Sequence, residues 1–250
     1  MHKELCRDVT VKSVPGATDF VNAGATPYIF VLSFMEEVMR GDALPISIIC
    51  FGDSLTAGYQ SPTHDIPYIH ETPYGAFLQQ RLGPQATVTS SGICGEVTTE
   101  MVQRFPRDVL GKAPNYVVIL GGTNDLGSYT PPGEIFDRLR TLYSQAQSAD
   151  IRPVAVTVPS IRMEADPVAN QWVTEFVRQR QHLNRLIVDH CRREKLSCVD
   201  LFTATAERET GLLAMPYSND GLHLTTAGYQ KMADLLYDEV FRNYMLDQHE

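Results

Sequence analysis

The chain of 250 residues is long enough for one large α/β domain, and its 43% apolar and 20% charged residues are typical of a globular protein. Its formal net charge of −9, without a long basic run, argues against nucleic acid as a partner. Five cysteines, an odd number without a C-x-x-C pair, predict reduced thiols and hence a cytoplasmic location.

Residues 1–45 show little pattern, and we expect them to form an N-terminal extension to a main domain in residues 46–250. The longest apolar run, YIFVLSFM at 28–35, is shorter than the roughly 20 residues that a bilayer span needs. Glu36 and Glu37 follow the run directly, and no Ala-x-Ala cleavage site does. The segment therefore predicts an amphipathic helix over about 27–40, and neither membrane insertion nor a secretory signal.

From residue 46 onward, short apolar runs alternate with segments of helical spacing. Strands are expected at 46–51, 86–92, 115–122, 152–160 and 196–202. Helices are expected at 73–82, 96–109 with a break near Pro106, 134–149, 168–195 and 225–244. The apolar runs are mostly continuous, as in strands buried on both faces. The pattern predicts a three-layer α/β/α sandwich with a mainly parallel five-stranded sheet.

Four segments are rich in Gly, Ser, Asn and Asp. Three of them begin at or near the end of an expected strand, and the fourth lies between the last expected strand and the last expected helix. They are GDSLTAGY (52–59), SSGICGEVT (90–98), GGTNDLG (121–127) and SNDGLHLT (218–225). Ligands of open parallel sheets bind at the carboxyl ends of the strands. We therefore expect these four segments to converge on one site.

Ser54 stands directly after the first expected strand, where a sheet could present it as a nucleophile. A serine hydroxyl becomes nucleophilic when a base takes its proton, and histidine is the usual base. Asp220 and His223 are three residues apart at the expected start of the last helix, a spacing that can place both on one side of a turn. The sequence predicts a catalytic set in which His223 is the base and Asp220 orients its imidazole.

Attack of a serine on an ester carbonyl creates an oxyanion, which needs hydrogen-bond donors already in place. The candidate donors are the N–H of Ser54, the N–H of Gly95 and the side-chain amide of Asn124. Gly95 is chosen because a glycine lets the backbone approach a ligand closely, and Gly92 is the neighbouring alternative.

These four blocks resemble those of the SGNH hydrolases, also called GDSL esterases and lipases. The serine, glycine, asparagine and histidine of that family match Ser54, Gly95, Asn124 and His223, and its aspartate matches Asp220. The resemblance covers roughly residues 46–240. It implies a flavodoxin-like fold, hydrolysis of esters or thioesters, and no cofactor or metal. Two positions depart from the family pattern, because Ser90 stands where asparagine is common and Glu96 where aspartate is common.

Simpler interpretations exist for single residues. Asp53 and Ser54 also suit a helix or turn cap, and Asn124 suits a turn with positive φ. The ordered occurrence of all four blocks favours the catalytic interpretation of Ser54 and Asn124. We assign loop support to Asp53 and Asp125.

The loop after the first block, SPTHDIPYIHETP, contains further polar residues. His64 and His70, with Asp65 and Glu71, could form a metal site, but their spacing fits no standard ligand pattern. We therefore expect this loop to line a pocket instead.

The sequence as a whole predicts a serine esterase that acts on small carboxylic esters, with short acyl or aryl esters as the expected substrates. Three alternatives stay open: an acyltransferase with the same residues, a deacylase of carbohydrates or lysophospholipids, and a non-catalytic ligand-binding module of the same fold. The G-x-S-x-G, P-loop, H-E-x-x-H and G-x-G-x-x-G motifs do not occur. The oligomeric state cannot be deduced from the sequence.

Overall fold

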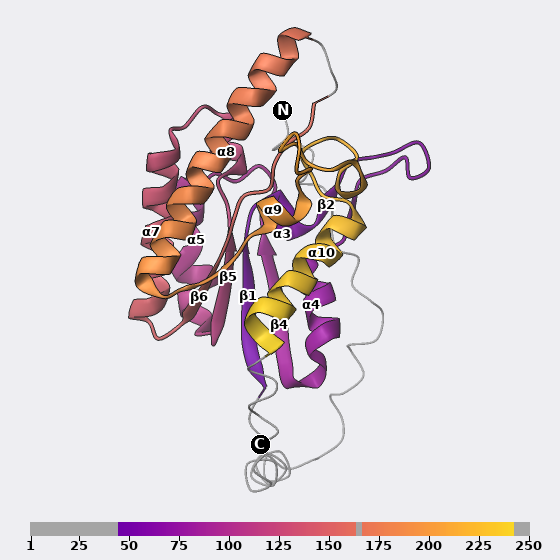
Figure 1. The fold of residues 1–250 in the computed structure, drawn as a ribbon. Helices are drawn as coiled ribbons and strands as arrows, with labels where there is room; N and C mark the ends of the chain where they lie inside the picture. The colour runs from indigo at the N-terminus through magenta and orange to yellow at the C-terminus, as the bar shows by residue number, and fades with distance from the viewer. Residues whose placement is uncertain (1–44, 164–166, 243–250) are drawn as a thin grey trace, which may run out of the picture. The chain divides into compact units, whose positions relative to one another are not determined.

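β1, Ile46–Gly52, lies inside the central sheet and pairs with a neighbouring strand on each side. The computed structural model describes residues 45–163 and 167–242 (Figure 1). β1 is almost entirely buried, as its continuous apolar run predicts for a strand covered by helices. The helix expected at about 27–40 lies outside the described residues, and the domain boundary near residue 45 stays a prediction.

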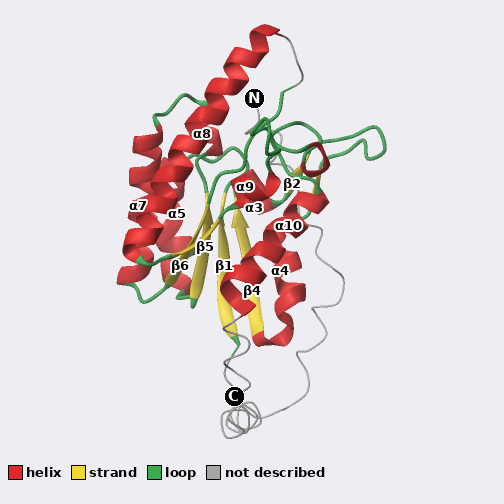
Figure 2. Ribbon diagram, in the orientation of Figure 1, coloured by secondary structure: helices red, strands yellow, loops and turns green. Residues whose placement is uncertain are grey.

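Five parallel strands form the sheet in the order β4–β1–β5–β6–β7 (Figure 2). The other four are β4 Ala86–Gly92, β5 Tyr116–Leu120, β6 Arg152–Val156 and β7 Ser197–Val199. This is the flavodoxin-like order, in which the direction of winding reverses at the first strand and ligands bind beyond the carboxyl ends. The predicted three-layer architecture with a parallel five-stranded sheet is confirmed.

Helices cover both faces of the sheet (Figure 1). One face carries α4 Tyr74–Leu82 and α10 Thr226–Leu236, and the other carries α5 Thr98–Asp108, α7 Pro132–Ser148 and α8 Pro167–Glu194. Strand side chains alternate between the faces. In β1, Ile48 and Cys50 therefore join one apolar core, and Ile49 and Phe51 join the other.

Several elements differ in length from the prediction. The strand expected at 196–202 ends at Val199, because the Asp200 side chain caps a short helix, α9 Leu201–Thr205, by accepting a hydrogen bond from the Thr203 N–H. β6 ends at Val156, four residues before the end of the strand expected at 152–160. Pro106 lies inside α5, which ends two residues later. α10 continues beyond its end into a π-helical turn.

The sequence did not predict the short elements between these strands and helices. They are α3 Ser54–Ala57, the two-stranded sheet of β2 Tyr59–Gln60 and β3 His70–Glu71, α6 Thr123–Gly127, and three 3₁₀ turns at Gly83–Gln85, Leu110–Lys112 and Met215–Tyr217. The π turn, Tyr237–Phe241, lies within the helix expected at 225–244. α3 follows β1 and α6 follows β5, so both lie at the carboxyl edge of the sheet.

Two expectations from composition can be compared with the described residues. Cys50, Cys191 and Cys198 are free thiols, as expected, and Cys6 lies outside the described ranges. Across residues 45–163 and 167–242, we find no helix with the length and apolar character that a bilayer crossing requires.

Candidate active site

Ser54 lies where β1 passes into α3. Asp53 is the N-cap of α3, and its Oδ1 accepts a hydrogen bond of 2.9 Å from the Leu55 N–H. The cap and the strand together fix the backbone of Ser54, whose exposed fraction is 3%. Both interpretations of the GDS stretch therefore hold: Asp53 is a helix cap, and Ser54 is presented at the edge of the sheet.

His223 reaches Ser54 from the other end of the chain. Its Nε2 lies 3.1 Å from Ser54 Oγ, and its Nδ1 lies 2.7 Å from Asp220 Oδ2. A carboxylate on Nδ1 favours the tautomer in which Nε2 accepts a proton. The Tyr59 ring packs against the imidazole, with 4.4 Å between the ring centroids. The three predicted side chains therefore form one row of hydrogen-bonding groups.

Asp220 and His223 lie in a loop, and the expectation that they begin a helix is wrong. α10 begins only at Thr226, after a series of bends. Asp220 Oδ1 accepts hydrogen bonds from the backbone N–H of Leu222 at 2.9 Å and of His223 at 2.7 Å. Oδ1 of Asp220 therefore closes the turn, and the turn brings the His223 imidazole to Oδ2 of the same carboxylate. A helix is not needed to bring the two side chains together.

Asp220 is held in its ionised form. Burial alone would raise the pKa of this carboxyl, but hydrogen bonds from His223, the Ser61 hydroxyl and the Leu222 N–H bring the pKa below its ordinary range. The Ser61 Oγ lies 2.5 Å from Asp220 Oδ2. Asp220 is therefore a stable anion beside the imidazole, as orientation of His223 requires.

The loop that carries Asp220 and His223 is fixed by backbone contacts. Ser218 Oγ donates to the His223 carbonyl at 2.6 Å and accepts from the Gly221 N–H at 2.9 Å. Gly221 has φ of +79°, and a Cβ there would overlap the Arg162 carbonyl oxygen. Only glycine fits this approach of the loop to the segment after β6.

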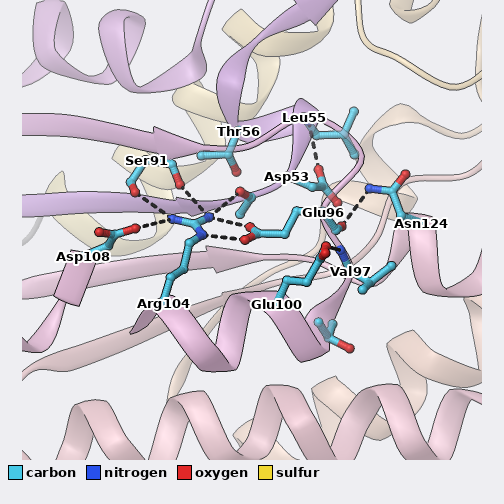
Figure 3. Close-up of polar contacts among 12 residues, drawn as sticks. Asp53, Leu55, Thr56, Ser91, Glu96, Val97, Glu100, Arg104, Asp108 and Asn124 are labelled. Atoms are coloured by element: carbon cyan, nitrogen blue, oxygen red, sulfur yellow. Dashed lines mark hydrogen bonds and ion pairs between the residues drawn. The ribbon is translucent and has the colours of Figure 1, made fainter. Parts of the chain in front are cut away.

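The three predicted oxyanion donors lie on neighbouring segments at the carboxyl edge. Asn124 Nδ2 donates to the Glu96 carbonyl at 2.9 Å, which ties the asparagine to the residue after Gly95 (Figure 3). Gly95 has a φ of +73°, in the left-handed region that favours glycine. Gly92, the alternative, belongs to β4 and pairs with Gly52. The geometry places Gly95, rather than Gly92, next to Asn124.

Asp125 supports the start of a neighbouring helix, in keeping with the loop-support role expected for it. Its carboxylate accepts hydrogen bonds from the Thr98 N–H at 2.8 Å and the Thr98 hydroxyl at 2.6 Å. Arg138 contacts it at 3.3 Å. This buried cluster joins α6, which begins with Thr123 and Asn124, to the N-terminus of α5.

The loop from 60 to 73 shows no metal-binding arrangement. His64 and Asp65 contact each other with fully exposed side chains, while His70 belongs to β3. Over the described ranges, no three side chains of His, Cys, Asp or Glu lie close enough together to hold a metal ion.

Sequence reasoning missed a buried cation next to the site. Arg104 of α5 forms an ion pair of 2.6 Å with Glu96, and both side chains are almost fully buried (Figure 3). The sequence signal for it was weak: Glu96 stood out only as a departure from the family pattern, and Arg104 was one residue of the helix expected at 96–109. The eight-residue spacing does not predict a contact, because the two residues belong to a loop and a helix.

Asp53 is a second buried carboxylate beside Ser54. Burial raises the pKa of Asp53 to about 7, although the Leu55 N–H and the nearby His223 lower it. Its Oδ2 has no hydrogen-bond partner among the described residues. Ionisation of Asp53 therefore costs more in the folded chain than in the unfolded chain, where an aspartate pKa is about 3.9.

This difference predicts a pH-dependent stability. Between about pH 4 and pH 7 the folded chain binds more protons than the unfolded chain, so ionisation of Asp53 lowers the free energy of unfolding as pH rises. We expect Asp53→Asn, which keeps a capping oxygen, to remove this decrease and to be more stable at pH 8 by up to about 4 kcal/mol. Urea unfolding at pH 5 and pH 8 measures the free energy of unfolding, and the exposed Asp65→Asn variant is the control. If Asp53→Asn kept the pH dependence of the wild type, the prediction would be wrong.

The strand order and the row from Ser54 to Asp220 define a flavodoxin-like α/β protein with a hydrolase-like polar site at the carboxyl edge of its sheet. A sequence model of the GDSL-like Lipase/Acylhydrolase family matches residues 50–231. The chain therefore belongs to this family, and the resemblance found in the four blocks is confirmed.

Solved structures share this fold. A carbohydrate acetylesterase from Sinorhizobium meliloti is 20% identical, with a TM-score of 0.65 over 79% of this chain and 99% of that one. The native aryl esterase of M. smegmatis is 20% identical, with a TM-score of 0.63 over 78% of this chain and 98% of that one. An uncharacterized lipoprotein of Bacillus subtilis, YqeF, is 29% identical over 102 residues, and the match spans 41% of each chain.

Proposed function

We propose that this protein is a serine esterase that hydrolyses small carboxylic esters. One observation carries the proposal: Ser54 Oγ, the two ring nitrogens of His223 and Asp220 Oδ2 form a row with spacings of 3.1 Å and 2.7 Å. Base and nucleophile are within the distance that proton transfer requires, and the base has an ionised partner. Membership of an acylhydrolase family supports the same class of reaction.

In the proposed reaction, Ser54 Oγ attacks the ester carbonyl while its proton passes to His223 Nε2. The N–H groups of Ser54 and Gly95 and the amide of Asn124 bind the oxyanion. His223 then protonates the leaving alcohol, and the acyl group stays on Ser54. Water, deprotonated by the same imidazole, attacks this acyl-serine and releases the acid.

We propose short acyl or aryl esters as substrates. Leu126 of α6 lines a cavity of about 510 Å³ in the same part of the domain, although Ser54, Asn124 and His223 are not among its described lining residues. Tyr129, Trp172 and Phe176 contribute aromatic rings to it, and the Tyr129 and Phe176 ring centroids are 5.6 Å apart. The support for this choice is that two proteins with similar folds are an aryl esterase and a carbohydrate acetylesterase.

The proposal is tested with p-nitrophenyl esters from acetate to palmitate and with a fluorophosphonate probe. We expect turnover that is greatest for the short acyl chains, and one covalent adduct on Ser54 identified by peptide mass spectrometry. A folded protein that neither hydrolyses any of these esters nor reacts with the probe would overturn the proposal in favour of a binding module.

A further inference from the structure

One buried guanidinium binds three segments of the site. Arg104 Nε and Nη2 donate to the two carboxylate oxygens of Glu96, both at 2.6 Å (Figure 3). Nη2 also donates to the Gly52 carbonyl at 2.9 Å and to the Ser91 carbonyl at 3.1 Å. Nη1 donates to Ser91 Oγ at 2.9 Å and to Asp108 Oδ2 at 3.1 Å.

This arrangement uses the specific geometry of arginine. The side chain of Arg104 is 7% exposed, that of Glu96 is 4% exposed, and the guanidinium lies 4.0 Å from the centroid of the Phe51 ring. Burial of two charges is costly unless their hydrogen bonds are nearly all made, and here the fork-shaped cation meets two carboxylates, two carbonyls and a hydroxyl. A lysine ammonium cannot reproduce two parallel bonds to one carboxylate together with bonds to two carbonyls.

The partners of Arg104 are the neighbours of the three candidate oxyanion donors. Gly52 lies two residues before Ser54, whose N–H is the first donor. Glu96 follows Gly95, the second donor, and its carbonyl accepts the hydrogen bond from Asn124 Nδ2. One hydrogen of the Asn124 amide is used in that bond, which leaves the other to bind an oxyanion. Each candidate donor is therefore separated from a residue that Arg104 binds by at most two positions in the chain or by one hydrogen bond.

We propose that Arg104, through its bidentate pair with Glu96, is a positioning residue that sets the spacing of the oxyanion donors contributed by the start of α3, the loop after β4, and α6. The inference rests on the proposed function, because it takes these donors to bind the oxyanion that forms during ester hydrolysis. Arg104 itself lies behind the donors and does not touch the substrate. Its effect is on geometry in the transition state, where a displacement of about 1 Å can cost about 100-fold in rate.

The test compares Arg104→Lys with the wild type, and with Arg140→Lys on the exposed surface of α7 as the matched control. We expect Arg104→Lys to lower kcat on p-nitrophenyl acetate by about 10- to 100-fold, with KM changed by less than about threefold. Arg140→Lys should keep both constants. The inhibition constant of phenylboronic acid, which forms a tetrahedral adduct on serine, should rise by about the factor that kcat falls.

A readout without turnover is the NMR signal of the Asn124 side-chain amide, assigned with Asn124→Asp. We expect this signal to shift in Arg104→Lys and to keep its position in Arg140→Lys. Glu96→Gln, which keeps the side-chain volume and one acceptor oxygen, serves as a second variant if Arg104→Lys does not fold, and the same signal should shift in it.

A folded Arg104→Lys protein with kcat within about twofold of wild type, or with an unmoved Asn124 signal, would overturn the inference. A lower melting temperature with unchanged kcat would assign Arg104 a purely structural role, and would also overturn it. An inactive wild-type protein would contradict the proposed function and would leave the role of Arg104 to a separate test. In that case the Asn124 signal alone decides whether Arg104 positions the amide.

Discussion

Ser54→Ala is expected to lower kcat/KM on p-nitrophenyl acetate by on the order of 10⁴- to 10⁶-fold, because no acyl-enzyme can form without the hydroxyl. Among the described residues, Ser54 Oγ is the oxygen that faces His223 Nε2, and it lies just beyond the carboxyl end of β1. The melting temperature should change little, because the hydroxyl makes one polar contact and alanine retains the Cβ.

The matched control is Ser144→Ala, which removes an exposed hydroxyl from α7. It should retain wild-type turnover and fluorophosphonate labelling, while Ser54→Ala loses both. Turnover of Ser54→Ala within about tenfold of wild type, in protein purified free of contaminating esterase, would exclude Ser54 as the nucleophile.

Asp220→Asn should have the second largest effect, a loss of about 10⁴-fold in kcat. Asparagine keeps Oδ1, so it can still accept from the N–H groups of Leu222 and His223 that close the turn. Its amide nitrogen would instead face His223 Nδ1 and donate to it. The imidazole would then carry its proton on Nε2, where it can no longer accept the serine proton.

The kinetic constants of Asp220→Asn and exposed Asp65→Asn, measured at pH 8, separate this effect from a change of net charge. Both substitutions remove one negative charge, and only Asp220→Asn should lose activity. If the two variants had equal kcat, the contact of Asp220 with the imidazole would not be needed for turnover.

Much of the fold could be predicted because local pattern and tertiary environment agree. β4 was predicted at its observed bounds, and β1, β5, α4 and α8 to within a few residues. β1 and β5 are continuously apolar and α8 is long, and burial in the sheet or against it reinforces their local preference. The short elements α3 and α6 could not be predicted, because a helix of four or five residues is stabilised by its surroundings and not by its own sequence.

The residues of the candidate site could be predicted in part, for a related physical reason. Ser54, Asn124 and His223 stood in turns of unusual composition, and the parallel sheet brings such turns to one edge. The turn around Asp220 was assigned to a helix, because three-residue spacing does not distinguish a helical turn from an Asx turn. The Arg104 pair was missed because its energy lies in burial and bidentate geometry, which depend on tertiary structure.

Ser54 and His223 are 169 residues apart in the chain, and their contact exists only after the loop that carries His223 has reached the end of β1. During synthesis at about 5–20 residues per second, His223 is added roughly 10–30 s after Ser54. A nascent chain whose sheet has already formed therefore carries an unactivated serine. Recovery of ester hydrolysis during refolding should accordingly follow the arrival of the His223 loop at Ser54, and not the formation of the sheet.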